Sequence, residues 1–280
     1  MSFFRGPSNR GILPGFGLTL GVTLLYFTLI VALPLLAMLY KIYGLGWVDF
    51  WTIISSERAI ATYRTTLGAA ALATIGNAVF GMLLAWVLVR YEFPGKRILD
   101  AVVDLPFALP TAVAGLALVT MFSGNGWFGQ FLEPLGIKVA YAPLGIAIAM
   151  MFTSIPFVIR TVQPVLEDVA SDVEEAARSL GANKWQVFAR VIWPAILPAF
   201  IAGCSLSFAR SLGEFGAIIF ISGNLPFETE VVSLLIFIRL DEYDYPAAAA
   251  LATVMLSIAF VMLFVTNSIQ AWQLRYAERN

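Results

Sequence analysis

The chain has 280 residues, of which 60% are hydrophobic and 12% are charged, and its formal net charge is −1. Soluble domains are about half apolar and about a quarter charged, so this composition excludes an ordinary soluble domain and predicts an all-α integral membrane protein. The near-zero charge gives no reason to expect nucleic acid as a partner. The absence of histidine excludes His-based catalysis and His-ligated metal, and a single cysteine excludes an internal disulfide. We therefore expect no catalytic residue, metal or cofactor on this chain.

Six apolar runs are long enough to cross the membrane, which takes about 20 residues of helix. In chain order they are Leu18–Tyr40, Thr66–Val89, Ala101–Phe122, Pro143–Ile159, Ala195–Ile221 and Ala247–Trp272. The first run is too long for the apolar region of a signal peptide, so we expect it to remain in the mature protein. The aromatic residues that follow it indicate an interfacial helix at the depth of the lipid headgroups, namely Trp47, Phe50 and Trp51.

The orientation follows from lysine and arginine, which are enriched in cytoplasmic loops. If the N-terminus is inside, the inner segments hold most of the basic residues, and the outer segments hold Lys41, Arg58, Arg64, Lys138 and Arg239. We therefore expect both termini in the cytoplasm. The predicted organisation is an N-terminal segment with the first span and the interfacial helix (1–60), one membrane domain (61–273) and a cytoplasmic tail (274–280).

Two prolines interrupt the third run. Proline has no N–H and its ring displaces the carbonyl four residues earlier, so Pro106 frees the carbonyl of Val102 and Pro110 frees that of Pro106. In hydrocarbon, free carbonyls are tolerated only against protein or a water-filled cavity. This half-broken helix is expected to line a pathway or a helix contact. The alternative is a simple kink.

The longest charged interruption separates the fourth and fifth runs. Ser171 and Glu174 have the spacing of a capping box, and the helix that they open is expected to end at Gly181. Asn183 and Gln186 offer a second helix start with the same spacing. The segment is therefore predicted to form two short helices around a glycine turn, built for contact with a partner. The alternative is an ordinary helical hairpin.

Polar residues in the fifth run recur with helical spacing on one face: Gly203, Ser207, Arg210, Ser211 and Glu214. Arg210 and Glu214 are four residues apart and are expected to pair, because an ionisable residue inside a span usually faces a cavity or the bundle interior. This face is either a translocation surface or a structural ion pair with a seam of small residues.

The charged interruption resembles the EAA loop of bacterial ATP-binding-cassette (ABC) importer permeases. The resemblance is carried by Glu175, Ala176, Ala177, Gly181 and Pro194. In that family the loop docks into a separate cytoplasmic ATPase, which implies that Ser171–Leu180 is the coupling helix. The family pattern ends Ile-x-Leu-Pro, whereas this chain has Ile192-Trp193-Pro194 preceded by Val191.

Longer segments resemble one branch of that family, the T-type sulfate/thiosulfate permeases. They are Asp104–Gly115, Ser207–Ala217 and Arg239–Ala249. The resemblance implies a type I importer fold in the cell inner membrane and a translocation pathway for which Pro106, Pro110, Ser207, Arg210, Ser211 and Glu214 are candidates. It also implies a second related permease chain, an ATPase dimer that binds the ATP and a periplasmic sulfate/thiosulfate-binding protein, besides membrane lipid.

Two alternatives stay open. An ABC permease for another oxyanion, such as molybdate, shares versions of the first two of these segments. A secondary transporter or a membrane enzyme would need an inverted repeat or a catalytic constellation, and neither is visible in the sequence. No phosphate-binding loop occurs in the chain, because Gly95-Lys96 lacks both the upstream glycine and the following Ser or Thr.

Overall fold

The computed structural model describes residues 16–169 and 171–277, and the regular structure within these ranges is helical. Arg5, Arg10 and Arg279, which support the predicted orientation, lie outside the described residues, as does the end of the predicted tail. The prediction of an all-α membrane protein is confirmed by the five described helices that are long and apolar enough to cross a membrane.

These five helices correspond to five of the six predicted runs. The first, Phe16–Tyr43, combines α1 (Phe16–Phe27), the π-helical η1 (Thr28–Ala32) and α2 (Leu33–Tyr43). The others are α4 (Glu57–Arg90), α9 (Pro143–Asp168), the composite helix Lys184–Leu212, and α15 (Tyr245–Ala277) with its apolar part Tyr245–Ser268. The composite helix consists of α11 (Lys184–Val187), the π-helical η3 (Phe188–Ile192) and α12 (Trp193–Leu212).

The third predicted run is not one helix. It is divided into α5 (Lys96–Val103), α6 (Leu105–Ala108) and the apolar α7 (Thr111–Phe122). The second break has a local cause: Leu109 is extended, with ψ 134°, and the residue before a proline is driven out of the helical region. The predicted interruption by Pro106 and Pro110 is therefore confirmed, and it goes further than a kink.

The fifth predicted run is wrong at both ends. The helix already begins at Lys184, so α11 continues into the span and is not a separate short helix. It ends at Leu212, and after Gly213 the chain forms the short α13 (Ile218–Ile221). Glu214 therefore lies just beyond the helix and not on its face. The sequence-based prediction overlooked this break because the spacing of Arg210 and Glu214 fits one continuous helical face across Gly213.

Shorter helices connect the long ones. The predicted interfacial helix is α3 (Trp47–Ile54), where Trp47 packs edge-on against Trp51 with 5.8 Å between ring centroids. The remaining elements are α8 (Gly129–Leu132), the 3-10 turn η2 (Glu133–Leu135), α10 (Ser171–Ser179) and α14 (Val232–Asp241).

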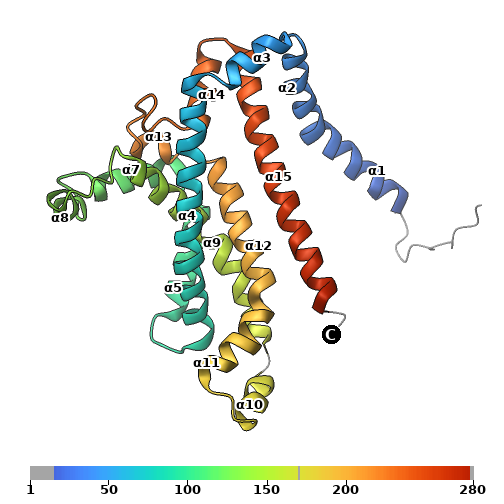
Figure 1. The fold of residues 1–280 in the computed structure, drawn as a ribbon, viewed down its shortest axis with the longest axis vertical. Helices are drawn as coiled ribbons and strands as arrows, with labels where there is room; N and C mark the ends of the chain where they lie inside the picture. The colour runs from blue at the N-terminus through green and yellow to red at the C-terminus, as the bar shows by residue number, and fades with distance from the viewer. Residues whose placement is uncertain (1–15, 170, 278–280) are drawn as a thin grey trace, which may run out of the picture.

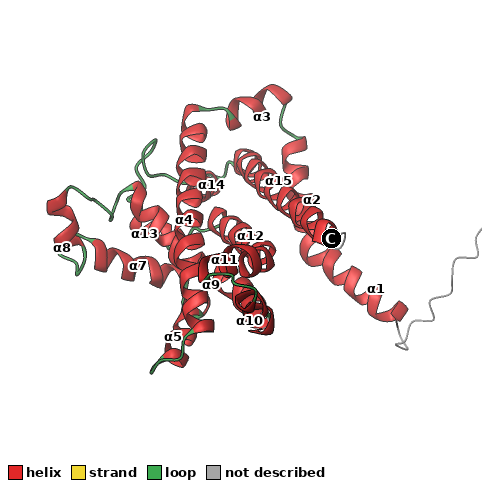
Figure 2. Cartoon of the chain, turned by 60° about the horizontal axis from the view of Figure 1, so that its bottom comes forward, coloured by secondary structure: helices red, strands yellow, loops and turns green. Residues whose placement is uncertain are grey.

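Three helices form the centre of the molecule, because α4, α9 and α12 pack against one another (Figure 1). α15 packs on α12 and α14, and α2 packs on α15 at the periphery. Figure 2 shows α7, α8 and α13 on the opposite side of this centre from α1 and α2. α5, α10 and α11 lie at one end of the long helices, whereas α3 and α14 lie at the other end (Figure 1).

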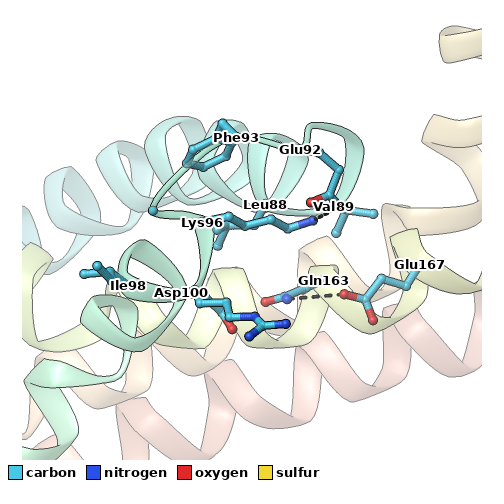
Figure 3. A pocket seen from close by; sticks show the side chains of 11 residues that line it. Leu88, Val89, Glu92, Phe93, Lys96, Ile98, Asp100, Gln163 and Glu167 are labelled. Atoms are coloured by element: carbon cyan, nitrogen blue, oxygen red, sulfur yellow. Dashed lines mark hydrogen bonds and ion pairs between the residues drawn. The ribbon is translucent and has the colours of Figure 1, made fainter.

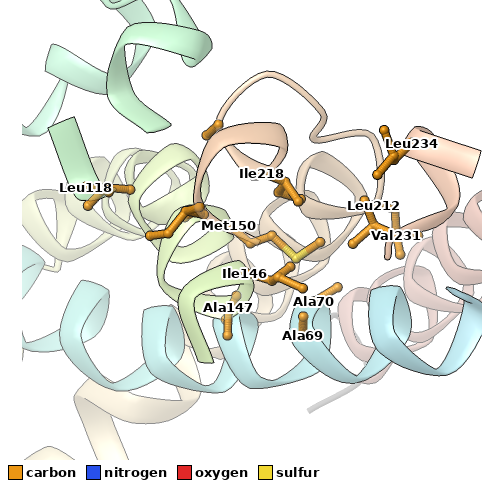
Figure 4. Close-up of a cluster of buried hydrophobic side chains, with 14 residues drawn as sticks. Ala69, Ala70, Leu118, Ile146, Ala147, Met150, Leu212, Ile218, Val231 and Leu234 are labelled. Atoms are coloured by element: carbon orange, nitrogen blue, oxygen red, sulfur yellow. The ribbon is translucent and has the colours of Figure 1, made fainter. Parts of the chain in front are cut away.

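The main apolar core lies where α13 and α14 meet the central helices (Figure 4). Alanines of α4 such as Ala70 and Ala73 are completely buried there against Ile146 and Met150 of α9. Small residues let helix backbones approach closely, which is how helices associate inside a membrane. α12 and α9 also approach closely at Gly203, where an added Cβ would lie 2.9 Å from the Cα of Val158.

A hydrogen-bonded polar cluster joins the same three helices. Asn77 of α4 donates from Nδ2 to Ser154 Oγ of α9 at 2.8 Å and to Ser207 Oγ of α12 at 3.0 Å. Ser207 and Ser211 each donate to Ser154 Oγ at 3.1 Å. The four side chains are completely buried. Because no water competes inside hydrocarbon, this cluster fixes how the three helices face one another.

Asn77→Ala is expected to lower the free energy of unfolding by about 1–2 kcal/mol, because it removes the hydrogen bonds that Asn77 Nδ2 donates to α9 and α12. The measurement is the thermal unfolding midpoint of the purified protein in detergent. Thr74→Ala is the matched control, since the Thr74 hydroxyl donates to the backbone carbonyl of Ala70, one turn earlier on the same helix. Equal midpoints for the two variants would contradict the role given to Asn77.

Candidate coupling and translocation site

The α10 segment ends in the glycine turn that the sequence predicts. Gly181 has φ +89°, the left-handed conformation that glycine adopts without strain. The N–H of Gly181 bonds to Arg178 O at 2.9 Å, and the N–H of Ala182 bonds to Ala177 O at 3.1 Å. This pair of bonds is the Schellman motif. The second helix start is also confirmed, because Asn183 and Gln186 form a reciprocal capping box.

The residues of α10 divide between an inner and an outer face. Glu174 is buried, and Ala177 packs against the apolar cluster at this end of α4 and α9. Val173, Ala176 and Leu180 are exposed, with 90% of Leu180 accessible. Glu175 is exposed as well. An exposed apolar stripe flanked by a carboxylate is a surface suited to a protein partner.

Glu174, which the spacing with Ser171 assigns to a capping box, forms an ion pair with another helix. Its carboxylate contacts Arg90, the last residue of α4, with 2.5 Å between Oε1 and Nη2. Its Oε2 lies 3.5 Å from Nη2 of Arg178. The side chain of Ser171 lies outside the described residues, so the capping box stays a prediction.

Aromatic side chains surround the start of the composite helix. Phe188 contacts Trp86 of α4, Trp185 and Trp193, with ring centroids 5.5, 5.7 and 6.1 Å away. Pro194 follows directly at the second position of α12, after the π-helical turn. The tryptophan that replaces leucine in the family pattern thus packs into this aromatic group.

A groove of about 840 Å³ lies beside this end of α4, between α5 and α9 (Figure 3). Its polar side chains largely pair with one another: Lys96 Nζ donates to Glu92 at 2.7 Å, and Gln163 donates to Glu167 at 3.3 Å. A lining with satisfied polar groups gives less reason to expect a ligand than the exposed stripe of α10.

The predicted Arg210–Glu214 pair is present. Arg210 Nη1 lies 2.8 Å from Glu214 Oε2, with 32% of the arginine side chain and 1% of the glutamate side chain exposed. Glu214 Oε1 also accepts the N–H of Ala217 at 3.0 Å. The carboxylate is thus fixed by one ion pair and one hydrogen bond, whereas the guanidinium remains partly accessible. Such an arrangement can hold an anion beside a group that weakens the attraction.

The other predicted pathway residues occupy different environments. Ser207 and Ser211 are buried in the polar cluster with Asn77, facing away from any surface of this chain. Pro106 is half-buried in α6, and Pro110 is exposed where α7 begins. The structure therefore brings Ser207 and Ser211 together with each other but separates their environment from that of the prolines.

Several residues that fix the site are missing from the sequence-based prediction. Arg160 of α9 makes two bonds of 2.8 Å to Asp104 and one of 2.7 Å to Asp100, which holds the broken third run. Arg58 makes two bonds, of 2.8 and 2.6 Å, to the buried Glu230. A lone polar residue inside an apolar run is a signal that could have indicated Asn77.

Comparison with known proteins agrees with this arrangement. Residues 77–276 match the family described as "Binding-protein-dependent transport system inner membrane component". The sulfate transport system permease protein CysT of Escherichia coli K12 is 54% identical over 264 residues, which is 94% of this chain and 95% of that protein. The protein of the same name from Synechocystis is 48% identical over 91% of this chain and 90% of its own.

Solved structures show the same fold at low identity. A chain of a bacterial ABC transporter involved in the import of alginate superposes with a TM-score of 0.74 at 20% identity, covering 91% of this chain and 94% of its own. A chain of the MetNI methionine ABC transporter in an inward-facing conformation gives a TM-score of 0.59 at 14% identity, over 82% and 99% of the two chains. The chain therefore belongs to the family of binding-protein-dependent transport system inner membrane components.

Proposed function

We propose that this chain is the membrane-spanning permease subunit of an ATP-driven importer of sulfate or thiosulfate. The observation that carries the proposal is the 54% identity to a sulfate transport system permease over 94% of the chain. The Arg210 guanidinium, partly accessible and beside a buried carboxylate, agrees with an anionic cargo. Transport, and not catalysis, is the activity of the chain itself.

The proposed source of energy is a separate ATPase dimer that docks on Ser171–Leu180. Support comes from the exposed stripe of Val173, Ala176 and Leu180 and from the exposed Glu175, which are available to a partner. A sequence without a phosphate-binding loop requires that the ATP be bound by other subunits.

The proposed assembly also contains a second, related permease chain and a periplasmic sulfate- or thiosulfate-binding protein. The binding protein would meet the end of the molecule that carries α3 and α14, opposite to α10 (Figure 1). In the proposed orientation both termini lie in the cytoplasm, and the chain lies in the inner membrane of the cell. The broken third run, α5 to α7, would supply the sixth crossing, within a membrane domain spanning 61–273.

The proposed pathway passes Arg210, with Glu214 as the group that limits how tightly the anion is held. A conduit must release its cargo, and a carboxylate next to the guanidinium lowers its affinity for a dianion. Pro106 and Pro110 would line the pathway through the carbonyls that they free. Ser207 and Ser211 would contribute after a rearrangement of α12 against α9, because both are buried in the described conformation.

Cells without this chain are expected to lose high-affinity uptake of labelled sulfate, because the importer lacks half of its membrane pathway. Uptake is measured over the first minutes, with the wild-type gene returned as control. Excess unlabelled sulfate or thiosulfate should compete, whereas excess molybdate should compete much less. Unchanged uptake in the deletion strain would refute the proposed function, and competition by molybdate alone would favour a different oxyanion.

Gly181→Val is expected to uncouple ATP hydrolysis from transport. The cost of about 1–2 kcal/mol arises from the positive φ and not from crowding, since a Cβ at Gly181 meets no atom within 4 Å. Gly136→Val is a closely matched control, because Gly136 has φ +78°, the same open surroundings and a position in the loop before α9. Sulfate uptake is measured at equal protein abundance. Normal uptake by the Gly181 variant, or equal losses in both, would count against the coupling role.

Arg210→Gln is expected to reduce sulfate uptake at least tenfold, because a neutral amide attracts the dianion far less than a guanidinium does. The control is Arg97→Gln: Arg97 is exposed on α5, at the end of the molecule opposite to α3 and α14. Both variants are compared at equal abundance. If Arg210→Gln transports as well as Arg97→Gln, Arg210 does not contact the cargo.

A further inference from the structure

An ion pair attaches α10 to the inner end of α4. Arg90 and Glu174 approach to 2.5 Å, and the glutamate side chain is 9% exposed. A hydrogen bond between two ionised groups is about twice as strong as one between neutral groups, especially where water is excluded. The second basic neighbour of the carboxylate, Arg178, is 3.5 Å away and 56% exposed, so its contribution is screened.

The position of Arg90 depends on this pair. The guanidinium lies 5.5 Å from the ring of Trp86, one turn earlier on α4. Its Nε is buried and makes no hydrogen bond within the described residues. Glu174 is thus the group that holds the guanidinium in place, and losing the glutamate charge leaves a partly buried cation without its charged partner.

The same end of α4 also contacts the segment after the Gly181 turn. The Trp86 ring packs edge-on against Phe188 of η3, with 5.5 Å between centroids. Arg90 therefore fixes the helix before the turn, and Trp86 fixes the helix after it. Both sides of the turn are attached to one helix.

α4 extends from this attachment to the opposite end of the molecule (Figure 1). It has 34 residues and so a length of roughly 50 Å. At its other end Arg58 forms a two-bond pair with the buried Glu230, which leads into α14. A displacement of α10 that is passed to α4 therefore reaches the end of the chain where cargo is expected to enter.

We infer that Arg90 and Glu174 are positioning residues for coupling. The pair fixes the orientation of α10 on α4, so that a movement imposed on α10 moves the central helices with it. Without the pair, the exposed stripe of α10 still contacts its partner, but the movement is lost in a rotation of α10 about the Gly181 turn. The inference rests on the proposed function, because it requires that an ATPase acts on α10.

The test uses Glu174→Gln in the complete transporter, reconstituted in liposomes with the loaded binding protein. Glutamine has the same shape and still accepts a hydrogen bond from Arg90, but it lacks the charge. Sulfate transported per ATP hydrolysed is expected to fall roughly tenfold, as the loss of a charged hydrogen bond shifts a two-state equilibrium. Copurification of the ATPase is expected to persist, because the exposed stripe is intact.

Two variants show whether the effect is specific. Lys96→Gln removes the ion pair with the exposed Glu92, 2.7 Å away beside the same end of α4. It is expected to leave the transport ratio within about twofold of wild type. The double variant Arg90→Gln/Glu174→Gln should be no worse than its worse single variant, because the two residues act as a unit.

Hydrogen exchange of the α10 backbone reports how firmly α10 is held on α4. It is measured on the purified chain and does not require the other transporter subunits. Residues 171–179 are expected to exchange faster in Glu174→Gln than in wild type, with α4 unchanged. A normal transport ratio, unchanged exchange, or an equal loss in Lys96→Gln would overturn the inference. Failure of the wild-type complex to import sulfate would refute the proposed function instead, and the exchange measurement would still decide the positioning.

Discussion

The absence of water from the hydrocarbon region is the constraint on which this structure depends. Polar groups there must find partners within the protein. Asn77, Ser154, Ser207 and Ser211 hydrogen-bond to one another where α4, α9 and α12 meet, and this contact fixes the centre of the molecule. The charged pairs lie at the ends of α4, where lower burial of the arginines keeps the cost of desolvation small.

Local signals in the sequence predicted much of the fold and of the coupling segment. Gly181 and the Asn183/Gln186 capping box act over a few residues, so their spacing alone identifies them. The prolines of the third run predicted an interruption for the same reason. The helix end at Leu212 was missed, because the spacing of Arg210 and Glu214 fits one helical face that continues across Gly213 between them.

Partners that are distant in the chain could not be predicted in this way. Glu174 has a local role by spacing, yet it binds Arg90, 84 positions away, and Asn77 binds Ser207 across 130 positions. A single sequence contains no information on which helix faces which. The Arg210–Glu214 pair was predicted because its members are close in the chain, even though the helix on which the prediction relied ends before Glu214.

The two π-helical turns, η1 and η3, each end two residues before a proline, Pro34 and Pro194. A π turn accommodates about one extra residue in a continuous helix and so rotates one part by about 100° against the other. In the composite helix, the side chains of Lys184–Val187 are therefore rotated about the helix axis relative to those of α12. The contact surface of α10 and α11 can therefore change direction without disturbing the register in which α12 packs against α4 and α9.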